Sequence, residues 1–342
     1  MKNLYLPFSQ YHLFLTFALS AEHSGDDNVV VLGDSDDEMI SAFELLSALF
    51  PEVKIHFVKL LASNTKNNLV NFMNKKKNLR AIENVLKSND FDRFYYFCEW
   101  SVYTAFASHL LRNKRCALYF CEDGMATYTE PYLRGKNFLE ERADKLIYGS
   151  WHKSVKVPGG LNDDASFALI FPDFAHEAYG KREKVRISHD RLIEKISKTK
   201  VDEIKRESGG AEFNEIIATD HDSYTDTDKY RELIRSEIEK GLASASSVAL
   251  KRHPRDENEY MKPNAQVTVL PNRYPIEIYY AVYRSSLKKV VGSLSTSLIT
   301  ARWFMKDAEI VSLLAKENLS QTENLDEKTQ LLQRLNISFG VV

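Results

Sequence analysis

The chain lacks several features that would place it in a class at once. Among its 342 residues are only three cysteines, Cys98, Cys116 and Cys121, and so low and odd a number favours a reducing compartment over a disulfide framework. The net charge is −2, so no basic excess indicates a nucleic-acid partner. No apolar stretch approaches the roughly 20 residues that a membrane-spanning helix needs, and Pro7 interrupts the short apolar run at the start, which argues against a signal peptide. We therefore expect a cytoplasmic globular protein, for which docking on a membrane surface stays open.

Short apolar runs alternate with helical patterns along most of the chain. We expect strands at 4–6, 29–32, 53–58, 91–98, 116–120 and 167–171, with helices at 11–19, 36–50, 67–86, 102–111 and 137–148. A second alternation has strands at 216–218, 248–250, 267–270 and 290–291, and helices at 228–242, 274–283, 297–303 and 329–335. This order is typical of parallel sheets covered by helices on both faces. It predicts an α/β fold with two Rossmann-like domains facing a cleft.

A highly charged stretch separates the two alternations. It begins near Lys181 and closes with Ser208-Gly-Gly. We therefore expect an N-terminal domain at 1–175, a crossing at 176–210 and a C-terminal domain at 211–342.

The first cluster of candidate chemistry is Glu122-Asp123-Gly124, directly after a predicted strand. Adjacent carboxylates at a strand end suit a general base, because each raises the pKa of its neighbour and partial burial adds to this. Paired acids also bind hard cations, and the segment is equally compatible with an ordinary polar turn.

The second cluster is the cationic turn from Lys251 to Arg255, in which Arg252, His253, Pro254 and Arg255 follow the strand 248–250. Open α/β sheets bind ligands beyond their strand ends, and Pro254 restricts the backbone of His253. A histidine near neutrality gives or takes a proton, so this turn could hold an anion and act on it. A solvated surface turn is the simpler alternative.

The third cluster places the hydroxyls of Ser293, Ser295, Thr296 and Ser297 between a predicted strand and a predicted helix. A helix amino end supplies unpaired N–H groups and a partial positive charge, and hydroxyls add donors, so a phosphate binds readily there. Plain N-capping explains one of these hydroxyls but not all four.

In this order the three clusters resemble the motifs of bacterial sialyltransferases of the lipooligosaccharide and capsular polysialyltransferase kind: (Asp/Glu)-(Asp/Glu)-Gly, His-Pro and Ser-(Ser/Thr). The segment Ser9-Gln10 to Leu15 resembles the first strand and helix of those enzymes, and Arg255-Asp256 follows His-Pro as it often does there. Tyr274-Pro-Ile-Glu277 lies where that group commonly has a Pro-x-Glu element. The middle of the chain, about 125–210, carries no such signature.

The resemblance implies an inverting glycosyltransferase of the GT-B type. It would move sialic acid from CMP-sialic acid to a hydroxyl of a bacterial surface glycan, either lipooligosaccharide or capsule. Glu122 or Asp123 would be the base, with a preference for Glu122, and His253 would stabilise the departing phosphate. Ser295 and Thr296 would bind the same phosphate and Glu277 the nucleoside. Substrate contacts are further expected from the following residues: Ser9, Gln10, Gly124, Arg252, Pro254, Arg255, Ser293 and Ser297.

The partners implied are a CMP-sugar donor and a glycan acceptor, with no nucleic acid. No cofactor or metal is expected, because one histidine and a helix end can neutralise a single leaving phosphate. Peripheral association with the inner face of the cytoplasmic membrane and a homodimer are both compatible with the sequence. The lysine run 75–77 is either a solvated face or a contact for an acidic polymer or anionic lipid.

Other functions and other roles stay open at this point. The donor could be Kdo or another acidic sugar, or the enzyme could be a CDP-glycerol-type polymer transferase. A nucleotide-sugar hydrolase or epimerase and a non-catalytic glycan-binding module are further alternatives. His12 either faces the cleft or packs and caps its helix, and the segment 220–223 either lines the cleft or caps a loop.

Overall fold

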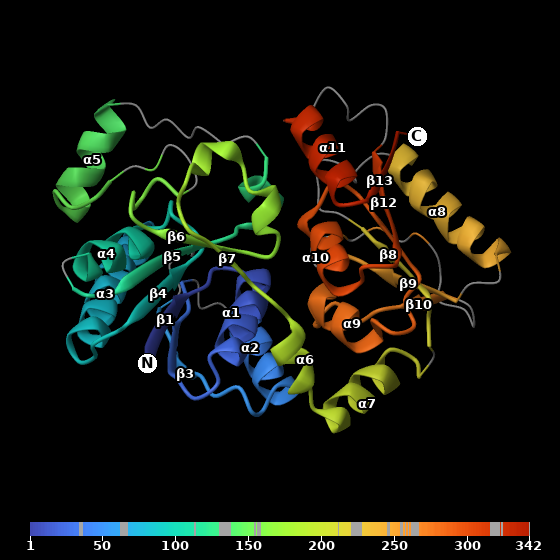
Figure 1. The fold of residues 1–342 in the computed structure, drawn as a ribbon, viewed down its shortest axis with the longest axis horizontal. Helices are drawn as coiled ribbons and strands as arrows, with labels where there is room; N and C mark the ends of the chain where they lie inside the picture. The colour runs from blue at the N-terminus through green and yellow to red at the C-terminus, as the bar shows by residue number, and fades with distance from the viewer. Residues whose placement is uncertain are drawn as a thin grey trace. The chain divides into compact units, whose positions relative to one another are not determined.

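The computed structural model divides the chain into two compact units, Met1–Lys195 and Ile196–Val342, and each is described by itself (Figure 1). The structure describes residues 1–33, 37–61, 68–112, 114–129, 138–153, 155, 159–210, 212–219, 228–244, 247–253, 256, 258, 260, 267–314, 322 and 324–341. Among the helices of these residues, none has the length and apolar composition needed to cross a membrane.

A seven-stranded sheet with the order β3-β2-β1-β4-β5-β6-β7 forms the centre of unit 1. All its pairings are parallel. The strands are β1 (Lys2–Leu6), β2 (Asp27–Val31), β3 (His56–Val58), β4 (Arg93–Tyr96), β5 (Ala117–Cys121), β6 (Ser166–Leu169) and β7 (Lys184–Arg186). The inner strands are buried on both faces, which explains why they appear in the sequence as nearly continuous apolar runs.

Helices cover both faces of this sheet (Figure 1). The helices are α1 (Gln10–Glu22), α2 (Asp37–Leu49), α3 (Asn68–Lys87), α4 (Val102–Leu111), α5 (Phe138–Tyr148) and α6 (Asp190–Glu194). Three short 3-10 helices are η1 (Gly124–Thr127), η2 (Pro172–Phe174) and η3 (Glu177–Tyr179). Helix α1 contacts α2 and α6, and α3 contacts α4. The core under α3 and α4 contains Leu79, Ile82 and Leu111 packed with Phe94 and Phe120 of the strands.

The α1 side of the sheet carries a row of stacked tyrosines. Tyr5, Tyr95 and Tyr119 are partners in the registers of β1, β4 and β5. Ring centroids lie 5.0 Å apart for Tyr5 and Tyr95 and 4.8 Å apart for Tyr95 and Tyr119. His23, which caps the end of α1, lies 3.1 Å from the Tyr95 hydroxyl. The row therefore fixes the register of the three strands and ties them to α1.

Unit 2 contains a six-stranded parallel sheet with the order β10-β9-β8-β11-β12-β13. Its strands are β8 (Glu215–Ala218), β9 (Val248–Lys251), β10 (Val267–Val269), β11 (Lys289–Gly292), β12 (Glu309–Leu314) and β13 (Ser338–Val341). Its helices are α7 (Lys198–Glu207), α8 (Asp228–Ala243), α9 (Ile276–Tyr283), α10 (Thr296–Phe304) and α11 (Leu325–Arg334). Helix α9 packs against α10, and α8 packs on β8 and β9.

Each sheet reverses its strand order once. In unit 1 the reversal lies between β1 and β4, and in unit 2 it lies between β8 and β11. Ligands of open parallel sheets bind outside the carboxyl ends of the strands at such a point. The functional side chains are therefore expected at this edge of each sheet.

The structure contains elements that the sequence analysis did not predict. The expected crossing, 176–210, holds β7 and α6 in unit 1 and α7 in unit 2. Strands β12 and β13 were also not predicted. Strand β7 has only three residues, two of them charged, and two of them are exposed at the edge of the sheet, so it lacks the apolar pattern of an inner strand.

Candidate active site

The acidic pair of unit 1 follows β5 and divides into one buried and one accessible carboxyl. Glu122 is fully buried. Its Oε2 accepts a hydrogen bond from the Ile170 amide at 2.6 Å and another from the Tyr128 hydroxyl, and its Oε1 accepts one from the Tyr11 hydroxyl. Burial raises the pKa of the Glu122 carboxyl to about 7, although the three hydrogen bonds act in the opposite direction. Glu122 therefore joins α1, η1 and β6 to the end of β5.

Asp123 lies next along the chain in a different environment. Its side chain is 32% exposed, and its Oδ1 lies 2.8 Å from Nε2 of His12, whose side chain is only 4% exposed. The Asp123 amide donates to the Thr127 hydroxyl at 2.8 Å, which fixes the backbone of the turn. Gly124 follows with a φ of 72°, a left-handed conformation that favours glycine. The turn thus leaves the Asp123 carboxyl accessible to solvent and buries the Glu122 carboxyl.

The segment after β1 supplies the partner of Asp123. Ser9 caps α1, because its hydroxyl accepts a hydrogen bond from the His12 amide at 3.2 Å. Gln10 donates from its side chain to Glu38 of α2 at 2.8 Å. The substrate contacts expected of Ser9 and Gln10 stay predictions, while the structure shows these two residues shaping the start of α1.

Gly33, after β2, allows the segment that follows β1 to pack closely against the backbone at this position. The Gly33 amide donates to the Pro7 carbonyl at 2.9 Å. A Cβ atom at Gly33 would overlap the ring of Phe8. The absence of a side chain there lets Phe8 sit where its own amide reaches His12.

In unit 2, the His253 turn is held from two sides. The His253 amide donates to the Thr219 hydroxyl at 3.1 Å, and the His253 carbonyl accepts from the Asp256 amide at 2.9 Å. The buried Asp256 carboxylate also accepts hydrogen bonds from Thr219 and from Tyr260, the latter at 3.0 Å. These contacts hold His253 just beyond the carboxyl end of β9, although Pro254 and Arg255 lie outside the described residues.

Two of the cations beside this turn have partners within it. The buried Lys251 donates to the Arg252 carbonyl at 3.0 Å and to the Asn272 side chain at 3.3 Å. Arg252 is half-buried and lies 3.5 Å from the Asn258 carbonyl. Glu277, in the first turn of α9, is buried, and this burial raises the pKa of its carboxyl to about 7 against the opposing charge of Lys251.

The hydroxyl cluster after β11 also divides into buried and accessible groups. Ser293 is buried and its hydroxyl lies 2.9 Å from that of Tyr230, so it belongs to the core of unit 2. Ser295, Thr296 and Ser297 are half-buried at the start of α10, and the Ser295 and Ser297 hydroxyls lie 2.6 Å apart. Ser295 precedes the helix without capping it through its side chain. These three residues, rather than Ser293, present donors at the helix amino end.

The unit 2 groups share one edge of the sheet. His253 follows β9 and the Ser295 cluster follows β11, and both strands pair with β8. Neighbouring strands lie about 4.8 Å apart, so the two groups flank the end of β8 across roughly 10 Å. This arrangement places a histidine and a group of hydroxyl side chains on either side of β8, next to the switch point.

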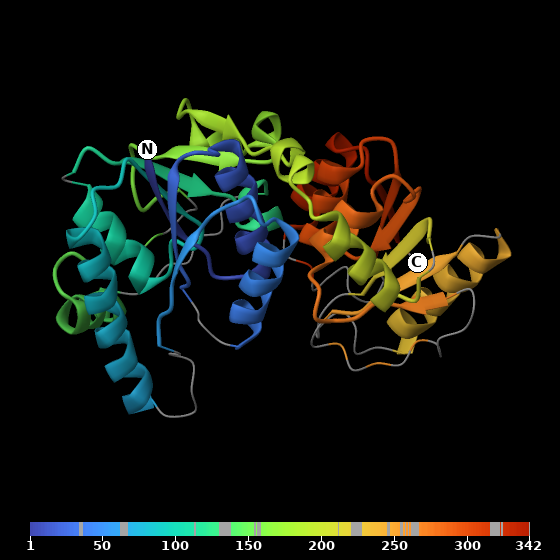
Figure 2. The same cartoon turned by 90° about the horizontal axis from the view of Figure 1, so that it is seen from below.

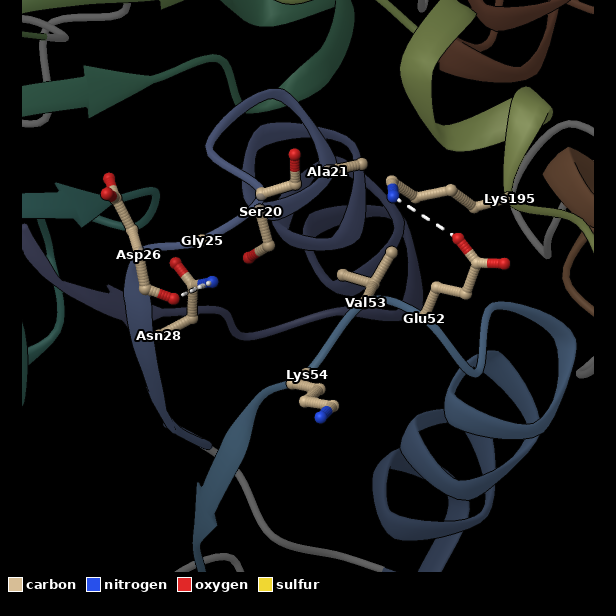
Figure 3. Close-up of a pocket in the computed structure, with 10 residues that line it drawn as sticks. Ser20, Ala21, Gly25, Asp26, Asn28, Glu52, Val53, Lys54 and Lys195 are labelled. Atoms are coloured by element: carbon tan, nitrogen blue, oxygen red, sulfur yellow. Dashed lines mark hydrogen bonds and ion pairs between the residues drawn. The ribbon is translucent and has the colours of Figure 1, made fainter.

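Two further observations bear on what the site is. Among the described residues, no group of three or more His, Cys, Asp or Glu side chains is placed to hold a metal ion. A pocket of about 360 Å³ lies in unit 1 beside the end of α1 and the start of β2 (Figure 3). It is lined by Ser20, Ala21, Ser24, Gly25, Asp26, Asn28, Glu52, Val53, Lys54 and Lys195, none of which is an expected site residue. The start of β2 is at the opposite edge of the sheet from Glu122, so this pocket is separate from the acidic pair.

Comparison with known families decides the class of the protein. The profile of the Alpha-2,8-polysialyltransferase (POLYST) family matches residues 3–314. The chain belongs to this family. It is accordingly a sialyltransferase, an enzyme that transfers sialic acid from a CMP-sugar, which confirms the class expected from the motifs.

Solved structures show the fold of this sialyltransferase. The alpha/beta-galactoside alpha-2,3-sialyltransferase of Photobacterium phosphoreum matches with a TM-score of 0.60 at 12% identity, over 99% of this chain and 98% of the other. The spinosyn rhamnosyltransferase SpnG gives a TM-score of 0.54 at 10% identity, over 98% and 84% of the two chains. The UDP-GlcNAc 2-epimerase of Methanocaldococcus jannaschii gives 0.52 at 11%, over 98% and 93%. Comparison with curated protein sequences gives no significant match. The two-domain α/β fold of the GT-B type is confirmed.

Several residues of the site were not predicted from the sequence. Tyr11 and Tyr128 donate to Glu122 although neither was expected at the site, and Thr219 reaches the His253 turn from the end of β8. His12 was noted, but its contact with Asp123 joins residues 111 positions apart. Tyr128 reaches Glu122 through the local turn, whereas the strand order brings the other residues together, and no local pattern in the sequence predicts that order.

Proposed function

We propose that this sialyltransferase adds sialic acid from CMP-sialic acid to a terminal sialic acid of a bacterial surface glycan, forming an α-2,8 linkage. Transfer proceeds with inversion and without a metal ion. The family match over residues 3–314 supports the choice of linkage and of acceptor. The observation that carries the mechanism is the accessible Asp123 carboxylate at the end of β5, held by His12.

Asp123 is the proposed base, in place of the earlier preference for Glu122. A base must come within hydrogen-bond reach of the hydroxyl that it deprotonates. Glu122 is fully buried and both its oxygens accept hydrogen bonds, whereas Asp123 is 32% exposed. As the oxygen of the acceptor hydroxyl attacks the anomeric carbon of the donor sugar, Asp123 takes the proton of that hydroxyl. A single displacement of this kind inverts the configuration at the anomeric carbon.

Unit 2 supplies the groups for the departing CMP. As the bond between the sugar and the phosphate oxygen breaks, the negative charge moves onto the phosphate. His253 donates a hydrogen bond or proton to it, and Ser295 and Thr296 bind it at the amino end of α10. A monophosphate is neutralised by these groups, so no divalent ion is needed. Glu277, close enough to Lys251 for their charges to interact, is the proposed contact of the nucleoside.

Unit 1 also carries a surface suited to a membrane. Large apolar side chains are exposed at four positions of α3 and three of α5: Leu69, Val70, Phe72, Met73, Leu139, Leu146 and Ile147. The two helices touch, because Lys76 of α3 donates to the Ile147 carbonyl at 3.0 Å. Lys75, Lys76, Lys77 and Arg80 are the charged residues of α3 before Glu83. We propose that this α3–α5 surface docks the enzyme on an anionic bilayer, where apolar side chains and cations both find partners.

Transfer assays with matched variants test the mechanism. The enzyme is incubated with CMP-sialic acid and acceptors that end in sialic acid or galactose, with EDTA present, and the products are analysed by mass spectrometry. Asp123→Asn and His253→Ala should each lower kcat at least 100-fold, because each loses a proton-transfer or charge-stabilising group. Asp164→Asn, an exposed carboxyl of the same unit, serves as the control.

Four results would contradict the proposal. Full activity of Asp123→Asn would show that Asp123 is not the base. Abolition of transfer by EDTA would show that the reaction needs a metal ion. Faster transfer from CMP-Kdo, or use of CDP-glycerol, would change the donor.

A further inference from the structure

His12 is a buried histidine that contacts the proposed base but takes no part in the proton transfer itself. It lies in the first turn of α1, is 3% exposed, and stacks on Phe97 with ring centroids 4.6 Å apart and planes inclined by 18°. Its amide donates to Ser9 and its carbonyl accepts from Thr16 at 2.8 Å. The backbone and the ring of His12 are therefore both held in place.

The two ring nitrogens of His12 have different partners. The Phe8 amide donates to Nδ1 at 3.3 Å, so Nδ1 carries a lone pair and no hydrogen. The single proton of the neutral ring is then on Nε2, which lies 2.8 Å from Oδ1 of Asp123. The backbone of Phe8 thus assigns the tautomer that donates to Asp123.

Asp123 depends on this donor for its orientation. Among the residues that the structure describes, His12 is the one side chain that forms a hydrogen bond with the Asp123 carboxylate. With Oδ1 occupied by the imidazole, Oδ2 is the oxygen left for another partner. Phe97 follows β4, which lies between β1 and β5 in the sheet, so the stack spans the switch point of unit 1.

From this geometry we infer that His12 is a positioning residue for the base of sialyl transfer. It holds Oδ1 of Asp123 in a neutral N–H···O hydrogen bond and directs Oδ2 to the acceptor hydroxyl. The inference rests on the proposed role of Asp123. Orientation of a reacting group is worth a large part of a catalytic rate, and a misplacement of 1 Å can cost about 100-fold.

Two substitutions test the hydrogen bonds of the two ring nitrogens separately. His12→Gln places an amide N–H near the position of Nε2, so it can still donate to Asp123. His12→Asn places a side-chain oxygen near Nδ1, so it can still accept from Phe8 but cannot reach Asp123. We expect His12→Asn to lower kcat by roughly 10- to 100-fold with KM for both substrates changed less than about threefold, and His12→Gln to recover most of kcat.

A role in folding alone would give a different pattern. Both variants would then lose thermal stability, and the kcat of the folded fraction would stay at the wild-type value. Equal impairment of kcat in His12→Gln and His12→Asn, or wild-type kcat in His12→Asn, would overturn the inference.

A measurement on the unaltered protein keeps the inference testable if the variants fail to fold. In ¹H–¹⁵N spectra of histidine-labelled enzyme, His12 should show a proton on Nε2 and none on Nδ1, with an Nε2 shift that moves in Asp123→Asn. The opposite tautomer, or an unchanged shift, would contradict it.

The double variant distinguishes this failure from that of the proposed function. With Asp123 already replaced by Asn, His12→Asn should cause no further loss of kcat. Wild-type activity of Asp123→Asn refutes the base itself, whereas loss in Asp123→Asn with full activity in His12→Asn refutes only the positioning role.

Discussion

Neighbouring carboxyls at the end of β5 differ in solvent exposure, and the different roles that we propose for them rest on this difference. Glu122 is fully buried and accepts hydrogen bonds from two tyrosines and a backbone amide, whereas Asp123 is one-third exposed and has His12 as its partner. The position of the pair could be predicted from the sequence, because acidic residues after an apolar strand form a local pattern. It could not rank the two acids, because burial depends on Tyr11 and Tyr128 arriving from other segments.

Removal of one tyrosine hydroxyl should show how Glu122 is stabilised. The Tyr128 hydroxyl donates to Glu122 and accepts from the Phe171 amide at 3.1 Å. Tyr128→Phe should lower the free energy of unfolding by about 1–3 kcal/mol, because a buried carboxyl and a backbone amide each lose a partner. The loss should be larger at pH 8 than at pH 5.5, since the Glu122 pKa is about 7 and the charged form needs the donor more.

Urea unfolding at the two pH values measures this difference. Tyr119→Phe, whose hydroxyl has no contact with Glu122, is the control. An equal loss at both pH values would mean that Glu122 does not titrate in this range.

At the scale of the elements, α3 and α5 stand out because they leave apolar side chains uncovered. The first half of α3 extends beyond the rest of unit 1 (Figure 2). Leu69, Phe72, Met73 and Lys76 recur at helical spacing in the first half of α3, whereas the buried Ile82 and Leu86 lie in its second half. The sequence predicted this helix well and left its lysine run either solvated or bound to an anionic partner, because exposure of the apolar side chains is a tertiary property.

Vesicle sedimentation tests the α3–α5 surface. The wild-type enzyme should co-sediment with vesicles rich in phosphatidylglycerol, and less so at high salt, because four cations near an anionic surface contribute about 1 kcal/mol each. A variant with Leu69→Glu, Phe72→Glu and Met73→Glu should bind at least 10-fold more weakly and keep its activity on a soluble acceptor. Val185→Glu, an exposed apolar position of β7, is the control.

Two outcomes would contradict membrane docking. Unchanged vesicle binding in the triple variant would place the contact elsewhere. A change from dimer to monomer in that variant, with no vesicle binding by the wild type, would make the surface an interface between copies of the chain.

Across the whole molecule, buried carboxyls make stability depend on pH. Burial raises the pKa of Glu99, Glu122 and Glu277 from 4.5 to about 7 in each case. Between pH 4.5 and 7 the folded chain therefore holds more protons at these groups than the unfolded chain does. Their contribution to stability falls as the pH rises through this range, by up to about 3 kcal/mol for each group.

Glu99 offers the simplest test of this dependence. It follows β4 and accepts hydrogen bonds from the amides of Gly159 and Leu161, the latter at 3.0 Å. Glu99→Gln keeps an acceptor there and removes the titration, so the decline in unfolding free energy from pH 5 to pH 7.5 should be shallower than in the wild type. A Glu99→Gln slope equal to that of the wild type would contradict the raised pKa.

For the fold of the whole molecule, some parts could be predicted from the sequence and others could not. The inner strands and most helices were predicted, since strands buried on both faces and helices with one apolar face leave clear patterns. The short edge strand β7 and the final strands β12 and β13 were missed. The strand order was also beyond the sequence, although it is what brings His12 to Asp123 and Thr219 to His253.

The position of β1 has a consequence for synthesis on the ribosome. Strand β1 (Lys2–Leu6) is an inner strand of its sheet, pairing with β2 on one side and with β4, which is synthesised much later, on the other. One edge of β1 therefore has no strand to pair with until its partner β4, Arg93–Tyr96, has left the exit tunnel. The nascent chain needs protection from aggregation during that interval, and pausing of translation before β4 should increase its dependence on chaperones.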